Sequence, residues 1–177
     1  SMGGRALVGK LCRRVLLPVM SWKTGGVMTT KIENEAVPDT ITRPARESSI
    51  PDLAAFVRSM ATECGYRDET VDGLGQAAEE AASNIIRFAC RGRQAEISIT
   101  CLIHENGALY ITITDTGEPF NMLLAGTFPE ADDFFSGGEK PSTKIMKRAA
   151  KNLEYKRNAD KNILIFTVSH DPGGIRR

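Results

Sequence analysis

The feature that most constrains the fold is an amphipathic helical run followed closely by two alternating strands on a tight turn. Apolar residues recur at spacings of three and four across residues 68–89, which predicts a helix with one face in the core. Residues 96–103 and 108–114 alternate apolar and polar side chains, and Glu105-Asn106-Gly107 between them is typical of a hairpin turn. Strands joined by such a turn are antiparallel, which disfavours a parallel, doubly wound sheet.

The other predicted elements agree with an antiparallel sheet. Strands are expected at 40–44, 153–157 and 163–168, and helices at 50–63 and 143–151. The order strand, helix, helix, strand, strand, helix, strand, strand contains too few crossovers for a parallel sheet. We therefore predict an α+β fold, a two-layer sandwich in which a mainly antiparallel mixed sheet carries helices on one face.

A long stretch without periodicity separates the second hairpin strand from the third helix. Residues 117–142 contain three prolines and four glycines. Segments of this length inside a compact domain are usually functional lids or disordered loops.

Composition excludes several classes of function. The net charge of +1 and the pI of about 7.6 give no electrostatic case for binding nucleic acid or an anionic membrane. No apolar run approaches the roughly 18 residues that span a bilayer. The four cysteines show no C-x-x-C spacing, so a structural zinc site is not expected and reduced thiols of a cytoplasmic protein fit best: Cys12, Cys64, Cys90 and Cys101.

The chain is expected to consist of one globular domain with two flanking segments. The domain is predicted at residues 38–169, and residues 170–177 form a tail. Residues 1–37 are a basic leader, which we expect to be poorly ordered. A partner-contacting arm and a weakly membrane-associated segment are the alternatives for its first 27 residues.

Two polar motifs stand out against these elements. Glu80 and Asn84 lie four residues apart, a spacing that stacks both side chains on one flank of the helix, within reach of one ligand or metal ion. Glu79 falls on the far side of the same helix. Further along, Asp115 ends an apolar strand and is followed by Gly117. Together, in this order, the motifs indicate a nucleotide site.

These residue types suit a nucleoside triphosphate with Mg²⁺. Mg²⁺ prefers oxygen ligands, and the side-chain carbonyl of Asn84 supplies one while phosphates and water fill other positions. Glu80, one turn earlier, is the candidate base for a hydroxyl or water. The Asp115 carboxylate accepts from an exocyclic amine such as that of adenine. Gly117 allows backbone to approach a flat ring, and Phe120 is placed to wall the pocket or anchor the lid.

The chain resembles the histidine-kinase-like ATPases, the superfamily that also includes gyrase and mismatch-repair ATPases. Residues 80–84 (Glu-Ala-Ala-Ser-Asn) look like its N box, and residues 115–120 (Asp-Thr-Gly-Glu-Pro-Phe) look like its first glycine box. Residues 152–155 (Asn-Leu-Glu-Tyr) look like its V-E-Y-type strand. The closest likeness is to the anti-sigma factor serine/threonine kinases, and it covers about residues 38–169.

The resemblance implies a Bergerat-type fold that binds ATP with Mg²⁺ and works with protein partners. Members bind a sigma factor, and many phosphorylate a serine of a STAS-type anti-anti-sigma protein; a homodimer is also implied. Glu80 would be the catalytic base and Asn84 the metal ligand. Nucleotide contacts would come from Asn84, Asp115, Gly117, Phe120, Gly137, Gly138, Ser142, Thr143 and Thr167.

The second glycine box departs from the family pattern. The family has a G-x-G-L-like run that opens the helix before the last hairpin. Here Gly137 and Gly138 stand several residues earlier, and Ser142 and Thr143 occupy the predicted helix start. Hydroxyls and free N–H groups at a helix start can still bind phosphate.

Three functions fit the pattern. The first is a serine kinase that regulates transcription by partner switching. The second is a catalytically weak or inactive ATP-binding module that sequesters a protein partner. The third is a detached sensor-kinase ATPase subunit that acts on a histidine of another chain.

Overall fold

The chain divides into two compact units, Ser1–Val37 and Pro38–Arg177. The computed structural model describes residues 14–22, 28–36, 38–104, 106–125 and 140–170.

The larger unit contains a five-stranded sheet in the order β3-β4-β5-β7-β6. Every pairing in it is antiparallel. Its strands are β3 (Asp39–Pro44), β4 (Glu96–Ile103), β5 (Leu109–Asp115), β6 (Asn152–Asn158) and β7 (Lys161–Val168).

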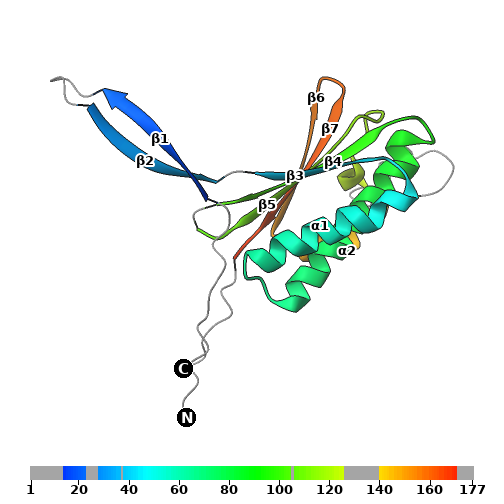
Figure 1. Cartoon of the computed structure of the whole chain (residues 1–177). Coiled ribbons are helices and arrows are strands. Elements are labelled where there is room, and N and C mark those ends of the chain that lie inside the picture. The colour runs from blue at the N-terminus through cyan, green and yellow to red at the C-terminus, as the bar shows by residue number, and fades with distance from the viewer. Residues whose placement is uncertain (1–13, 23–27, 37, 105, 126–139, 171–177) are drawn as a thin grey trace, which may run out of the picture. The chain divides into compact units, whose positions relative to one another are not determined.

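Helices cover one face of this sheet. The two long helices, α1 (Ile50–Glu63) and α2 (Asp68–Asn84), lie side by side on that face (Figure 1). The short helix α3 (Lys144–Ala149) packs against α2. The predicted α+β two-layer sandwich is confirmed. No helix in the described part of the chain combines the length and apolar character that crossing a bilayer requires.

The core lies between the sheet and the helices, because burial alternates along the strands. In β5 every second residue is buried, beginning with Leu109 and ending with Asp115. Opposite it, α2 buries the predicted stripe that includes Leu74, Ala78 and Ala81. The last buried position of β5 therefore places a carboxylate on the helix-covered face.

The second predicted helix changes geometry at its end. The α-helix stops at Asn84 and continues as a π-helix, η2 (Ile85–Cys90), where a single helix to residue 89 was expected. The helix then ends at Arg91 in the left-handed conformation, with φ 46°. Such wider turns occur frequently at functional sites, and this one begins directly after a candidate site residue.

The described part of the larger unit also contains two 3-10 turns. The first, η1 (Glu47–Ser49), leads from β3 into α1. The second, η3 (Met122–Leu124), lies within the predicted lid, and residues 126–139 of that lid lie outside the described part of the chain.

The smaller unit contains an antiparallel hairpin. Strand β1 (Arg14–Trp22) pairs with β2 (Met28–Ala36) along its whole length. The β-branched and apolar content of these segments favours such pairing. Pro18 is tolerated there, since each strand of a two-stranded sheet has a free edge. The rest of the leader, residues 1–13, 23–27 and 37, lies outside the described residues.

Candidate functional site

The two neighbouring carboxylates near the end of α2 contact different elements. Glu79 Oε1 accepts a hydrogen bond from the Arg58 guanidinium of α1 at 2.9 Å. Glu80 instead faces α3. Its Oε1 accepts from the Ser142 hydroxyl at 2.5 Å, and its Oε2 accepts from the Met146 backbone N–H at 2.9 Å. The predicted separation of Glu79 from Glu80 is confirmed.

Glu80 therefore caps a helix other than its own. The first N–H groups of a helix have no partner within it, and the N-cap residue of α3, Thr143, makes no side-chain cap hydrogen bond. The Glu80 carboxylate supplies the missing acceptor, and its negative charge is favoured at a helix N-terminus. One of the helix-start N–H groups on which phosphate binding was predicted is thus already bonded to protein.

Asn84 lies one turn after Glu80 and contacts the same segment. Its Nδ2 donates to the backbone oxygen of Ser142 at 2.6 Å and lies 3.6 Å from the sulfur of Met122. The side chain is buried, with 5% exposure. Within the described residues no donor reaches its Oδ1. This oxygen is the atom that a metal ion would bind.

Asp115 lies at the end of β5, on the helix-covered face, and is 3% exposed. Its Oδ1 accepts from the Gly117 N–H at 2.9 Å and from Asn162 Nδ2 at 2.8 Å. Its Oδ2 has no donor in the described part of the chain. Burial raises the pKa of Asp115, while the bonds from Asn162 and Gly117 and the charge of Arg157 lower it. One carboxylate oxygen is held in place and the other remains for a ligand.

Asn162 on β7 is the site residue that the sequence analysis missed. It pairs with Asp115 in the sheet, and its Nδ2 also donates to the Glu118 carbonyl at 2.8 Å. Its Oδ1 accepts from the Phe120 N–H at 3.1 Å and from the Tyr155 hydroxyl at 2.7 Å. Asn162 thus fixes both the carboxylate and the loop that follows it. Only the register between β5 and β7 brings it there, and no local motif marks it.

The chain after Asp115 turns back onto the end of the π-helix. A Cβ added at Gly117 would lie 2.8 Å from the Ala89 Cβ and 2.8 Å from the Ala89 carbonyl oxygen, so only glycine fits. The Glu118 N–H donates to that same oxygen at 3.0 Å. Beyond it, the Phe120 ring stacks on Phe88 with 5.4 Å between centroids. Phe120 therefore anchors the start of the predicted lid on the helix.

The predicted residues fall into two contacting groups and a remainder. Glu80, Asn84 and Ser142 form one group, and Asp115 and Gly117 with Asn162 form the other. The segment from Phe120 to Met122 links them, because Phe120 bonds to Asn162 and Met122 contacts Asn84. Thr143 is buried beside the first group, at the start of α3. Gly137 and Gly138 lie outside the described residues.

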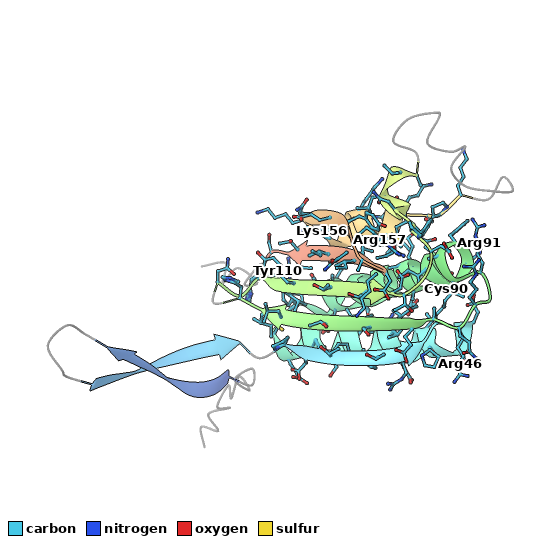
Figure 2. All side chains as sticks on the ribbon, turned by 90° about the horizontal axis from the view of Figure 1, so that it is seen from above. Arg46, Cys90, Arg91, Tyr110, Lys156 and Arg157 are labelled. Carbon is cyan, nitrogen blue, oxygen red and sulfur yellow. The ribbon has the colours of Figure 1, made fainter. Side chains whose placement is uncertain are left out.

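Thr167 does not join either group. It pairs with Tyr110, and it is half-buried on the sheet face opposite to that of its buried neighbours Phe166 and Val168. Figure 2 shows Tyr110 toward one end of the sheet and Arg157, which bonds to Asn162, toward the other. Alternation along β7 therefore places Thr167 on the wrong face, and Asn162 occupies the position beside Asp115.

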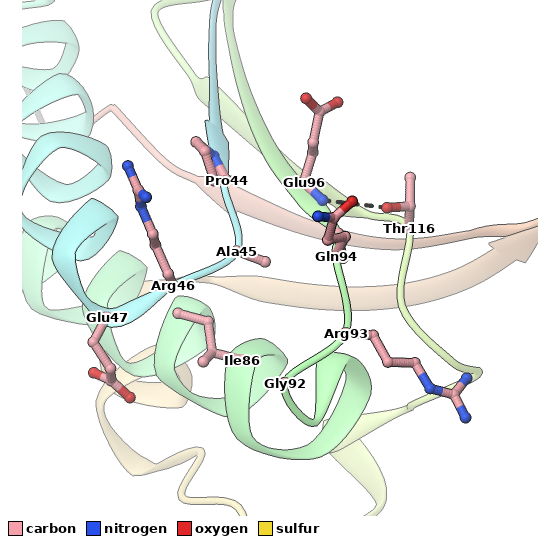
Figure 3. A pocket seen from close by; sticks show the side chains of 11 residues that line it. Pro44, Ala45, Arg46, Glu47, Ile86, Gly92, Arg93, Gln94, Glu96 and Thr116 are labelled. Atoms are coloured by element: carbon pink, nitrogen blue, oxygen red, sulfur yellow. Dashed lines mark hydrogen bonds between the residues drawn. The ribbon is translucent and has the colours of Figure 1, made fainter.

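Two cavities flank the end of the sheet where these residues lie. A cavity of about 740 Å³ lies between the turn after β3 and the start of β4, and its lining includes Arg46, Gln94 and Thr116 (Figure 3). A smaller cavity of about 210 Å³ borders Gly117 and Arg157. Only the smaller cavity is lined by a predicted site residue.

Sequence comparison matches the chain to a known domain family. The sequence profile described as the histidine kinase-like ATPase domain matches residues 43–168, well over half of the chain. No curated protein matches this chain. Family membership implies nucleotide binding.

A solved structure of low sequence identity shows the same fold. The RsbU and RsbW domains of Rv1364c from Mycobacterium tuberculosis align with a TM-score of 0.53 and 12% identity, covering 80% of this chain and 34% of that one. The histidine kinase domain of a blue-light activated histidine kinase from Erythrobacter litoralis EL346 aligns with a TM-score of 0.42 and 16% identity, covering 68% and 59%. This chain thus spans about a third of the first structure. By its sequence match, the chain belongs to the histidine kinase-like ATPase domain family.

Proposed function

We propose that this chain is an ATP-dependent serine/threonine protein kinase of the anti-sigma factor type. The observation that carries the proposal is the convergence of Glu80 and Asn84 on one segment, Ser142, while Asp115 faces the same helical layer from the sheet. A base, a metal ligand and an adenine-reading carboxylate are the three protein groups that such a kinase requires.

Each of the three residues has a role that follows from its free or bonded atoms. The Oδ2 of Asp115, which has no donor among the described residues, would accept a hydrogen bond from the exocyclic amine of adenine. The Oδ1 of Asn84 would hold Mg²⁺, which neutralises charge on the phosphates. Glu80 would accept the proton of the attacking serine hydroxyl as that oxygen bonds to the γ-phosphorus and ADP departs.

The partners in this proposal come from the family resemblance. A STAS-type anti-anti-sigma protein would carry the acceptor serine, a sigma factor would be the protein that is bound and released, and a second copy of the chain would form a homodimer. The likeness of the fold to a structure that contains an RsbW domain agrees with this assignment.

Glu80 and Glu79 provide a matched pair of variants for the test. We expect Glu80→Gln to lower phosphate transfer from ATP to a STAS-domain protein of the same genome by about 10²- to 10⁴-fold, the usual effect of losing a general base. The affinity for Mg²⁺-ATP, measured by calorimetry, should stay within a few fold. Glu79→Gln should transfer phosphate at the wild-type rate, because Glu79 pairs with Arg58 instead.

Two outcomes would count against the assignment. Equal transfer by Glu80→Gln would remove Glu80 from the mechanism. Absence of ATP binding by the wild-type chain would remove the kinase proposal altogether.

A second candidate is a catalytically inactive ATP-binding module that sequesters a protein partner. It is favoured by one observation, namely that both carboxylate oxygens of Glu80 are already bonded, to Ser142 and to Met146. Calorimetry and a transfer assay on the same preparation separate the two. Tight binding of ATP with no transfer to any STAS-type partner supports the module.

A further inference from the structure

The shortest contact of the candidate base is with a hydroxyl of its own chain. The Ser142 Oγ lies 2.5 Å from Glu80 Oε1, a distance typical of a hydroxyl that donates to an ionised carboxylate. It also falls close to the hydrogen-bond reach that a general base needs for the proton it removes. Ser142 itself is exposed. A serine hydroxyl therefore already occupies the acceptor position of Glu80.

The same residue is held by the candidate metal ligand. Asn84 Nδ2 donates to the Ser142 backbone oxygen at 2.6 Å, which fixes the segment next to the hydroxyl. The neighbouring Thr143 hydroxyl does not compete, because Thr143 is only 6% exposed and makes no side-chain cap hydrogen bond at the start of α3. Ser142 thus contacts both residues that the proposed function assigns to phosphate transfer.

We propose that Ser142 is an intrachain phosphoacceptor, a proposal that rests on the kinase function above. The Ser142 Oγ would bond to the γ-phosphorus of ATP, the bond from that phosphorus to the β-phosphate oxygen would break, and ADP would leave. The hydroxyl proton would pass to Glu80 Oε1. No further reactant is needed, since ATP supplies the phosphoryl group and the chain supplies both base and acceptor.

Phosphorylation of Ser142 would limit itself, whereas the unmodified serine would compete with a partner's serine for Glu80. The phosphoserine is almost doubly negative and would lie beside the Glu80 carboxylate, so like charges would separate the two. While Ser142 remains unmodified, its hydroxyl occupies the oxygen that a partner's serine must reach. Ser142→Ala therefore removes a competitor of the partner.

The test is incubation of the full chain with Mg²⁺-ATP, followed by intact-mass and peptide mass spectrometry. We expect one phosphoryl group on Ser142, added with a first-order rate constant that does not depend on protein concentration. Ser142→Ala should remove the modification, and Ser142→Thr should keep it at a lower rate. Glu80→Gln should slow it about 10²- to 10⁴-fold, whereas Glu79→Gln should match wild type.

The outcomes distinguish this proposal from the kinase function beneath it. Calorimetric ATP binding and transfer to a STAS-type protein, with no phosphate on Ser142, would overturn the intrachain acceptor and leave the kinase intact. An apparent first-order rate constant that rises in proportion to protein concentration would also overturn the intrachain acceptor. Absence of ATP binding would overturn both.

A nucleotide-free measurement checks the contact itself. Ser142→Ala and Glu80→Gln both disrupt the same hydrogen bond, so the denaturation midpoint of the double variant should shift by less than the sum of the single shifts. Strictly additive shifts would show that the two side chains do not interact, and would overturn the proposal.

Discussion

Burial raises the pKa of Asp115, because a carboxylate that is 3% exposed loses most of its hydration. The hydrogen bonds from Asn162 and Gly117 recover part of this cost without cancelling it. A group whose pKa is higher in the folded than in the unfolded chain stabilises the fold only while it is protonated. Ionised Asp115 is therefore a cost to stability that a ligand amine would offset.

Asp115→Asn tests this balance. Wild-type stability should decline as the pH rises from the ordinary carboxyl value of 3.8 through the raised pKa, and the uncharged amide should escape that decline. The free energy of unfolding of the variant, relative to wild type, should thus increase with pH over this window. ATP affinity should fall roughly 10- to 100-fold, the effect of losing a hydrogen bond to a charged group worth about 1.5–3 kcal/mol.

Urea unfolding at a series of pH values and calorimetry with Mg²⁺-ATP provide the two measurements. A stability difference that stays constant across the pH range would contradict the raised pKa. Unchanged ATP affinity would remove Asp115 from adenine recognition.

At the scale of elements, the close approach of the loop after β5 to the π-helix joins the two groups of site residues. The obstacle to any larger side chain at Gly117 includes the Ala89 backbone, and no side-chain rotation relieves it. The loop and the helix end can therefore keep their contact only while residue 117 has no Cβ.

We expect Gly117→Ala to lower the free energy of unfolding by about 1–3 kcal/mol, because overpacking forces the backbone to shift. Gly73→Ala is the matched control. Gly73 lies in α2 with nothing within 4 Å of an added Cβ, so alanine there should stabilise the helix by up to about 1 kcal/mol. Urea denaturation measures both, and an unchanged midpoint for Gly117→Ala would contradict the close approach.

At the scale of the whole molecule, local patterns predicted the elements well. The first helix was predicted at 50–63 and α1 spans Ile50–Glu63, because an apolar stripe and a terminal glycine are local signals. The hairpin of β4 and β5 was likewise found from alternation and its turn. The hairpin of β1 and β2 was not predicted, since the sequence analysis treated residues 1–37 as a basic leader.

Non-local geometry limited prediction of the site. The faces that Glu80, Asn84 and Asp115 occupy could be predicted, because helix and strand periods fix them. Asn162 was missed, because the sequence does not state which residue of β7 pairs with Asp115. The capping of α3 by Glu80 was also not predictable, since it depends on how two helices pack.

The cap that Glu80 provides to α3 has a consequence for amide hydrogen exchange. A nucleotide-bound state in which the Glu80 carboxylate turns away from α3 to reach a partner's serine would leave the Met146 N–H without its acceptor. Mg²⁺-ATP should slow exchange across the core, because a ligand that binds only the folded chain raises its stability, and should accelerate exchange at Met146. Protection of Met146 along with the core would contradict this recruitment. If Glu80 is recruited in this way, the liganded chain is more protected from hydrogen exchange as a whole and less protected at the Met146 amide.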